Sequence, residues 1–367
     1  MYDAIVVGAR CAGSPVAMLL ARRGHRVLLL DRASFPSNTM RCHFIQPAGT
    51  RQLGQWGLLP AVAASNCPPI RSVSSDLGDF ALREPVEDVD GVDATYAPRR
   101  LVLDKILVDA AVTAGAELRE RFSVQTLLWQ EGSVVGVRGR VNGGPTVDEY
   151  AHIVIGADGA HSTVADAVQA PRYHEQPVLT YSYYSYFSGV PVDGAEVWLR
   201  PQNLYITFST NDALTCVAMQ APVAGFRSFR TDIEGNFFGA LDLVPQLAER
   251  VRQGDREERW YGTADIHNFF RKPHGPGWAL VGDAGYHKDP FQAQGISDAF
   301  RDAELLAGAI DAGLTGRIGL NQALETYEHQ RNEAALPGYE ENCAAAAFLP
   351  LPPQLLAERA AKRGGPL

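Results

Sequence analysis

One stretch decides the fold of this chain: Ile5-Val6-Val7-Gly8-Ala9-Arg10-Cys11-Ala12-Gly13, close to the start of 367 residues. Three consecutive apolar residues predict a β-strand that is buried on both faces, as in the centre of a parallel sheet. Gly8 permits a tight turn out of that strand, and Gly13 permits the following helix to pack close to the sheet. The stretch therefore predicts a strand, a tight turn and a helix, in that order.

The residues that follow extend this unit. Residues 12–23 predict the helix, with Gly24 in its C-terminal capping position, and residues 26–30 predict a second strand that ends at Asp31. A carboxylate at that place can accept hydrogen bonds from ribose hydroxyls, while a helix N-terminus attracts phosphates through its N–H groups and its dipole. The unit indicates a dinucleotide site, and the alternative is an ordinary tight strand-to-helix turn.

Arg10 departs from this pattern, because the middle position of a G-x-G-x-x-G motif is normally glycine. The Cβ atom and the long stem of arginine hinder the close approach of a pyrophosphate to the backbone. The guanidinium could instead fold over the phosphates or extend along the cofactor. We therefore include Arg10 among the candidate cofactor-binding residues.

Composition excludes several function classes. With 33 basic and 42 acidic residues the formal charge is -9, and no basic stripe indicates nucleic-acid binding. The five cysteines, at positions 11, 42, 67, 216 and 343, lack CxxC spacing, so we expect reduced thiols, no disulfides and no metal site. The first strand starts near residue 3 and no apolar run reaches the roughly 20 residues of a membrane span, so we expect a soluble, cytoplasmic protein.

Two later motifs also follow predicted strands. The first, Gly156-Ala157-Asp158-Gly159, ends a buried strand, and Ser162 could cap the next helix; alone, it is an unremarkable strand-to-helix turn in most proteins. In the second, Gly282-Asp283, the aspartate could bind sugar or ribityl hydroxyls, and a loop with Pro290 leads to a helix near Gly295. The N-terminus of that helix could stabilise negative charge on a reduced cofactor ring.

Three motifs in this order resemble the flavoprotein monooxygenase superfamily with the para-hydroxybenzoate hydroxylase type of fold, which includes geranylgeranyl-reductase-like enzymes and flavin-dependent halogenases. The resemblance covers about residues 1–310. It implies that the first motif binds FAD, that Asp158-Gly159 contacts FAD and a transient nicotinamide, and that Asp283 holds a cofactor hydroxyl. Arg100 resembles the family's FAD-contacting arginine at a helix start. The expected cofactor-binding residues are Gly8, Arg10, Cys11, Ala12, Gly13, Asp31, Arg32, Arg100, Val124, Asp158, Gly159, Asp283, Gly295 and Ile296.

The chain also departs from the family pattern. Tyr286 stands where histidine is frequent, Asp289 precedes Pro290 where a second proline is frequent, and Ala293 replaces a glycine. These departures affect the expected shape of the loop beside the flavin more than FAD binding itself. The halogenase pattern WxWxIP is absent, since the five tryptophans are isolated, and no second nicotinamide fingerprint is present.

We expect an α/β fold: a Rossmann-like FAD-binding domain, an inserted antiparallel β-sheet substrate domain and C-terminal helices. Segments of period two between residues 177 and 222 predict the inserted sheet, and a helix is expected over residues 44–58. The FAD-binding domain would be discontinuous in sequence. The expected ranges are 1–68, 98–170 and 272–318 for that domain, 69–97 and 171–271 for the substrate domain, 319–347 for a C-terminal helix and 348–367 for a tail.

His43 and Pro290 are the candidate catalytic residues. His43 lies where the family's chain passes close to the isoalloxazine, and it could act as a general acid or base because imidazole titrates near neutrality. The alternative is a capping or packing histidine. A covalent flavin link could form through His43 or Cys42, and His287 carries the same ambiguity as His43.

The segment Tyr181–Phe187 is rich in tyrosine, and its alternate side chains face opposite sides of the predicted sheet. Either face could line an aromatic substrate cavity together with Trp198, Tyr205 or Phe208. The alternative is a sheet that packs on its own core.

The leading hypothesis is an FAD-dependent monooxygenase that uses NAD(P)H and O2 to hydroxylate an aromatic, polyketide-like or other hydrophobic small molecule. The first alternative is a flavin-dependent reductase or dehydrogenase of a carbon–carbon double bond, as in the geranylgeranyl reductase branch. The second is a non-catalytic flavin-binding protein. In all three readings FAD is the expected cofactor.

Overall fold

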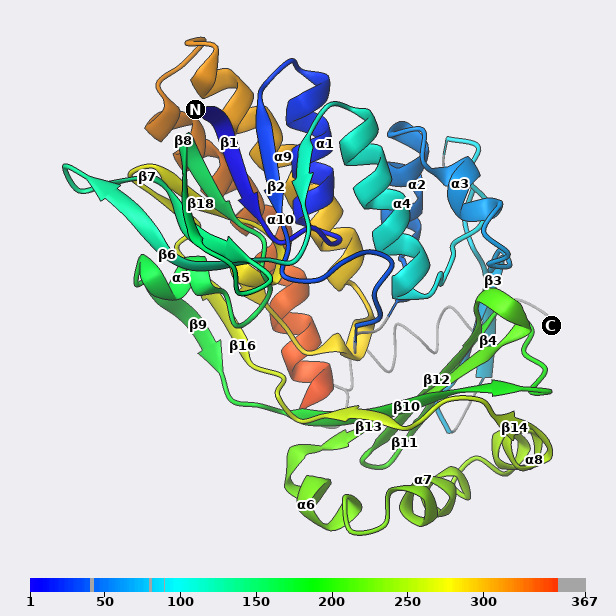
Figure 1. The fold of residues 1–367 in the computed structure, drawn as a ribbon. Helices are drawn as coiled ribbons and strands as arrows, with labels where there is room; N and C mark the ends of the chain where they lie inside the picture. Colours follow the sequence, from blue (N-terminus) through cyan, green and yellow to red (C-terminus); the bar gives the residue numbers. More distant parts are fainter. Residues whose placement is uncertain (40–42, 79–80, 89, 349–367) are drawn as a thin grey trace.

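The computed structural model describes residues 1–39, 43–78, 81–88 and 90–348. Its first sheet contains parallel strands in the order β18-β8-β1-β2-β5, and the short β17 adds an antiparallel edge (Figure 1). This arrangement confirms the α/β fold class expected from the first motif. The strands are β1 (Tyr2–Val7), β2 (Val27–Leu30), β5 (Glu117–Arg119), β8 (Thr146–Gly156), β17 (His274–Gly275) and β18 (Trp278–Leu280).

Both faces of β1 are buried, which explains its uninterrupted apolar run. Ala4 and Val6 face helices α1, α4 and α9, whereas Ile5 and Val7 face strands β6 and β7 and helix α5. The long helix α10 packs against α9. The elements are α1 (Gly13–Arg22), α4 (Arg100–Thr113), α5 (Thr163–Ala167), α9 (Gly295–Leu314), α10 (Leu320–Ala346), β6 (Phe122–Gln130) and β7 (Ser133–Val141).

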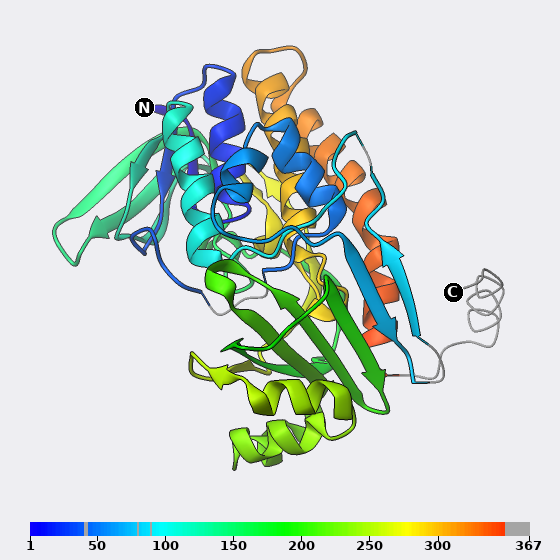
Figure 2. The ribbon, with the colours of Figure 1, turned by 90° about the vertical axis from the view of Figure 1, so that its right-hand side faces the viewer.

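The second sheet has the order β14-β10-β13-β12-β11-β3-β4, with β15 also paired to β10. Helices α6, α7 and α8 cover its face away from the first sheet (Figures 1 and 2). The strands are β3 (Ser72–Asp76), β4 (Ala81–Pro85), β10 (Thr180–Ser188), β11 (Ala195–Arg200), β12 (Asn203–Ser209), β13 (Thr215–Pro222), β14 (Asp255–Arg256) and β15 (Tyr261–Thr263). The helices are α6 (Phe226–Phe229), α7 (Ile233–Leu241) and α8 (Pro245–Gln253).

A small third sheet, β19-β16-β9, lies between the two larger sheets (Figure 1). Its strands are β9 (Arg172–Gln176), β16 (Asn268–Arg271) and β19 (Tyr286–His287). The described residues also form four short 3-10 helices: η1 (Asn211–Ala213), η2 (Val223–Gly225), η3 (Gly282–Ala284) and η4 (Pro290–Gln292). Among the helices that the structure describes, none is both long and apolar enough to cross a membrane.

The helix expected over residues 44–58 is shorter, and this expectation is corrected. Ile45 remains extended and pairs with Tyr96, while Pro47 starts α2 (Pro47–Gln55) because proline suits the first turn of a helix. Gly57, with φ +77°, interrupts the helical path before α3 (Leu59–Ala63). Helices α6 to α8 were not anticipated.

Candidate functional site

Backbone contacts explain both glycines of the first motif. A Cβ atom on Gly8, whose φ is +103°, would lie 2.4 Å from the carbonyl oxygen of Ala157. A Cβ atom on Gly13 would lie 1.8 Å from the carbonyl oxygen of Gly8. Residues 8–13, here called the phosphate loop, therefore fold tightly on themselves and on the turn after β8.

Asp31 ties the end of β2 to the phosphate loop. Its side chain is buried, and its carboxylate accepts hydrogen bonds from the backbone N–H of Ala9 at 2.8 Å and of Ala33 at 2.7 Å. The neighbouring Arg32 is exposed, and Val124 on β6 is half-buried against the core beneath the sheet. The contact between Asp31 and the ribose remains a prediction.

The guanidinium of Arg10 is directed toward α4. It lies 2.6 Å from the carboxylate of Asp104, donates to the Ser37 hydroxyl at 3.0 Å and stacks over Phe35 at 5.4 Å. Asp104 also accepts hydrogen bonds from Arg100 at 2.9 to 3.2 Å. Asp104 is not among the site residues expected from the sequence, although its position four residues after Arg100 on a predicted helix places the two side chains together.

Cys11 lies beside the same carboxylate, with its Sγ atom 3.5 Å from Asp104 Oδ1. Burial raises the pKa of the Cys11 thiol, and the negative charge of Asp104 raises it further. The thiol therefore stays protonated at neutral pH, which disfavours a nucleophilic role.

The second motif caps a helix. Asp158 accepts hydrogen bonds from the Ser162 hydroxyl at 2.5 Å and from the Thr163 N–H at 2.7 Å, while Ser162 caps α5 through the Ala165 N–H. Burial raises the pKa of Asp158, and these hydrogen bonds oppose the increase. Gly159, with φ +86°, has no atom within 4 Å of the position of a Cβ, so this side of the turn is open to a ligand.

The third motif packs on the first. A Cβ atom on Gly282 would lie 2.7 Å from the Cβ of Ala12, so glycine permits the two turns to meet. Asp283 follows in η3, 3.9 Å from the imidazole of His287. Burial lowers the pKa of Arg100, but neighbouring groups, chiefly Asp104 and to a smaller extent Asp283, raise it on balance. The phosphate loop, α4 and the Asp283 turn thus surround one site.

Arg271, which is not among the site residues expected from the sequence, connects the second and third motifs. It is almost fully buried, and its guanidinium donates to the carbonyl oxygens of Ala284 at 3.0 Å and Ala160 at 3.3 Å. Burial lowers its pKa. No local pattern marks this residue, because its partners lie in turns that are distant in sequence.

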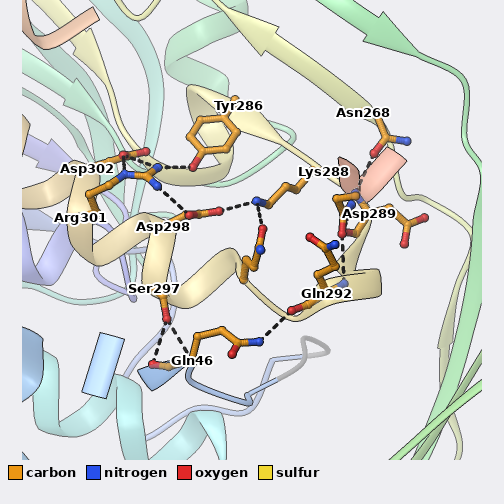
Figure 3. Close-up of polar contacts among 12 residues, drawn as sticks. Gln46, Asn268, Tyr286, Lys288, Asp289, Gln292, Ser297, Asp298, Arg301 and Asp302 are labelled. Carbon is orange, nitrogen blue, oxygen red and sulfur yellow. Dashed lines mark hydrogen bonds and ion pairs between the residues drawn. The ribbon is translucent and has the colours of Figure 1, made fainter. Parts of the chain in front are cut away.

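Residues 286–294, here called the Asp289 loop, are held by side chains from several elements (Figure 3). The buried Asp289 carboxylate accepts hydrogen bonds from Thr180 at 2.6 Å and Gln220 at 3.0 Å, and Asn268 accepts one from the Asp289 N–H. Burial raises the pKa of Asp289, and the bonds from Thr180 and Gln220 oppose this. Ala293 has φ +52°, the left-handed conformation in which glycine is favoured, which accounts for glycine at this place in the family pattern.

An ion-pair network joins the Asp289 loop to α9 (Figure 3). Lys288 lies 2.7 Å from Asp298, and Arg301 binds both Asp298 at 2.9 Å and Asp302 at 2.8 Å. Arg301 also donates to the Tyr286 hydroxyl at 2.7 Å, so the tyrosine that replaces a frequent histidine is part of this network.

The start of α9 faces the same site. Gly295 begins the helix, and a Cβ atom there would meet no atom within 4 Å, whereas Ile296 is buried in the core. Pro290 begins η4 in the adjacent loop. A helix N-terminus next to open space can stabilise a negatively charged group.

His43 belongs to an aromatic group on the face of the second sheet opposite helices α6 to α8. It is fully buried, its Nδ1 lies 3.4 Å from the Tyr186 hydroxyl, and its ring packs edge-on against Phe208 at 5.2 Å. Phe44 and Tyr184 complete this group, here called the aromatic junction, and Ala293 of the Asp289 loop packs against it. The candidate Cys42 lies outside the described residues.

The two faces of β10 differ in their neighbours. Tyr184 and Tyr186 face the aromatic junction, whereas Tyr181, Tyr183 and Phe187 pack against α6 to α8. Trp198 and Tyr205 belong to this second face, and Phe208 belongs to the first. Of these three residues, which could line a substrate cavity with either face of β10, only Phe208 lies in the aromatic junction.

The phosphate loop also fits a diphosphate chemically. Ser14, in the first turn of α1, is fully buried, and its hydroxyl has no hydrogen-bond partner among the residues that the structure describes. Within the described part of the chain, no side chain caps the N-terminus of α1. A hydroxyl donor, uncapped N–H groups and the guanidinium of Arg100 would together suit the phosphates of FAD.

The chain is similar in sequence to two groups of flavin enzymes and in fold to a flavin-dependent halogenase. Digeranylgeranylglycerophospholipid reductase 1 of Methanococcoides burtonii is 27% identical over 346 residues, covering 89% of this chain and 78% of the relative. Kynurenine 3-monooxygenase of Salinispora tropica is 28% identical over 358 residues, covering 89% of this chain and 76% of the relative. The structure of the myxobacterial chondrochloren halogenase CndH superposes with a TM-score of 0.88 at 22% identity, covering 98% of this chain and 89% of that one.

The family model described as an FAD binding domain matches residues 1–337. It spans all three motifs, and it confirms FAD as the cofactor class expected from the sequence. The chain belongs to the FAD-binding domain family and is an FAD-dependent oxidoreductase.

Proposed function

We propose that this protein is a monooxygenase that uses NAD(P)H and O2 to hydroxylate an aromatic, polyketide-like or other hydrophobic small molecule. The observation that carries the proposal is the contact between the Asp289 loop and the aromatic junction. Ala293, two residues before α9 begins at Gly295, packs against the buried cluster that contains Phe44, Tyr184, Tyr186 and Phe208. A hydrophobic ring held at this junction would lie next to the open N-terminus of α9.

The bound FAD would supply electron transfer and oxygen activation. The cofactor-binding assignments of the sequence analysis, from Gly8 to Ile296, and its domain ranges form part of this proposal. Arg100 and the phosphate loop would bind the diphosphate, Asp283 a ribityl hydroxyl, and the N-terminus of α9 the charge on the reduced ring. A nicotinamide would approach from the open side of Gly159 and leave again.

His43 and Tyr186 would position the substrate and handle its proton. Burial raises the pKa of Tyr186 well above its ordinary value, so its hydroxyl stays protonated and can donate to His43 Nδ1. That bond would favour the tautomer with a proton on Nε2. Nearly complete burial of both rings would exclude bulk water from the reacting atoms.

A coupled turnover assay tests this function. The purified protein is expected to be yellow, to be reduced anaerobically by NADH or NADPH, and to consume O2 in proportion to an oxygenated product from a phenolic or polyketide-type library. Reduced enzyme that returns only peroxide with every substrate would contradict the proposal.

The second candidate is reduction of a carbon–carbon double bond, which is favoured by similarity to the digeranylgeranylglycerophospholipid reductase. Anaerobic turnover of an isoprenoid alkene by the reduced protein, with saturated product and no need for O2, would select this reaction. A protein whose bound flavin is not reduced by NAD(P)H in the presence of either ligand class would instead be a non-catalytic flavin-binding protein.

A further inference from the structure

Asp104 is a fully buried carboxylate that pairs with two guanidiniums. Arg10 of the phosphate loop lies 2.6 Å from Oδ2, and Arg100 at the start of α4 lies 2.9 Å from Oδ1. Asp104 and Arg100 are inaccessible or nearly so, whereas 27% of the Arg10 side chain is exposed. The group therefore reaches solvent mainly through Arg10.

The charges of this group do not cancel. Two guanidiniums and one carboxylate give these three side chains together one net positive charge, because arginine remains protonated. A buried carboxylate near a diphosphate would repel it, but pairing with two cations reverses the sign of the local charge. The excess charge has the sign that a diphosphate requires.

The guanidinium of Arg10 is also fixed in place. Ser37 accepts a hydrogen bond from it at 3.0 Å and Phe35 supports its face, in addition to the Asp104 contact. These contacts connect the phosphate loop to α4 and to the segment after β2. A glycine at position 10 would remove all three.

We propose that Arg10, Arg100 and Asp104 form a charge triad that binds the FAD diphosphate in place of the usual middle glycine. Asp104 holds both guanidiniums, and Arg10 presents the excess charge to the phosphates. Close approach to a bare backbone is thereby replaced by charge-assisted hydrogen bonds from a fixed side chain. The inference rests on FAD binding by the proposed enzyme and is independent of the reaction that follows.

The test measures FAD binding to the full-length apoprotein by quenching of flavin fluorescence. Arg10→Ala is expected to raise the Kd for FAD about ten- to a hundredfold, the range for loss of a charge-assisted hydrogen bond. It should also flatten the dependence of Kd on salt concentration, which a merely structural change would not do. Arg10→Lys should retain the salt dependence but only part of the affinity.

A double-mutant cycle tests the role of Asp104. If Asp104 positions Arg10, Arg10→Ala should raise the Kd by a smaller factor in an Asp104→Asn background than in the wild type. Arg23→Met, at the other end of α1, is the matched control and should leave the Kd unchanged, with the melting temperature recorded for every variant. An unchanged Kd in Arg10→Ala, an unchanged salt dependence, or independent effects in the cycle would overturn the triad, whatever the outcome of the turnover assay.

Discussion

The phosphate loop and the Asp289 loop flank the same site but are held in different ways. Backbone atoms of Gly8, Gly13 and Ala157 determine the first, since no Cβ atom fits between them. The second depends on side chains from β10, β13, β16, α9 and α10, such as Asn342, which donates to the Asp289 carbonyl oxygen. Backbone sterics therefore set the shape of the phosphate loop, while the loop nearest the aromatic junction can vary through the side chains that hold it.

The largest effect is expected from Gly13→Ala in the phosphate loop. The new Cβ would overlap the Gly8 carbonyl oxygen, and a backbone atom cannot move aside as a side chain can. We expect a loss of more than about 3 kcal/mol in unfolding free energy and no retained flavin, measured by thermal melting and by absorbance of the purified protein.

Gly308→Ala is the control for this substitution, because its Cβ would meet no atom within 4 Å in the middle of α9. Alanine there should stabilise the protein by roughly 0.5 to 1 kcal/mol. If Gly13→Ala had the melting temperature and the flavin content of the wild type, backbone contacts would not constrain the phosphate loop as tightly as the contrast with the Asp289 loop requires.

The Asp289 loop should respond to loss of Lys288, the buried partner of Asp298. Lys288→Met is expected to lower the unfolding free energy by about 3 kcal/mol, because it removes one of the positive charges that pair with the largely buried Asp298 carboxylate. Lys272→Met removes an exposed lysine paired with Glu328 and should cost less than about 1 kcal/mol. If chemical denaturation showed that Lys288→Met and Lys272→Met lose equal unfolding free energy, the buried pair of Lys288 and Asp298 would have no special role in stability.

Asp302 should make stability depend on pH. Burial raises the pKa of this carboxyl from 3.8 to about 6, although Arg301 opposes the increase. Between about pH 4 and pH 6 the folded protein binds more protons at this site than the unfolded chain, so stability falls as pH rises through that window. The contribution lost is about 2 to 3 kcal/mol.

Asp302→Asn should therefore remove this part of the pH dependence of stability. The measurement is the change in melting temperature between pH 4.5 and pH 7, compared between the variant and the wild type. Asp255→Asn, at the exposed strand β14, should keep the wild-type profile. If melting temperature changed with pH in the same way in Asp302→Asn and in the wild type, Asp302 would not be the source of this pH dependence.

The smallest effect on stability is expected at the aromatic junction. Tyr186→Phe removes a hydroxyl whose bond to His43 is long, at 3.4 Å, so the unfolding free energy should change by less than about 1 kcal/mol. If this hydroxyl positions His43, product formation should fall about tenfold and its pH profile should shift. Tyr183→Phe, on the opposite face of β10, is the control and should change neither the rate of product formation nor its pH profile. Identical kinetics in the two variants would show that the Tyr186 hydroxyl has no role in the proposed reaction.

Local patterns were sufficient for the first strand, the phosphate loop, the second strand and the positions of Asp31, Asp158 and Asp283. Their partners could not be predicted in the same way. Arg271 contacts carbonyl oxygens of two turns that are 111 and 13 residues away in sequence, and no period or motif records such contacts. The short helices α6 to α8 were missed because packing on β10 stabilises them more than their own propensity does.

The sequence by itself determined the cofactor class and the β-α-β unit, because glycine spacing and apolar period express sterics and burial that act over a few residues. Only the tertiary structure decided the direction of the Arg10 side chain and which tyrosines of β10 lie in the aromatic junction. It also decided which side chains form hydrogen bonds with Asp289. These depend on side chains brought together from distant segments, whose desolvation and hydrogen bonding exist only after the sheets have packed. Arg10 illustrates both levels. The sequence shows that it replaces the usual glycine, and the tertiary structure shows that its guanidinium pairs with the carboxylate of Asp104 on α4.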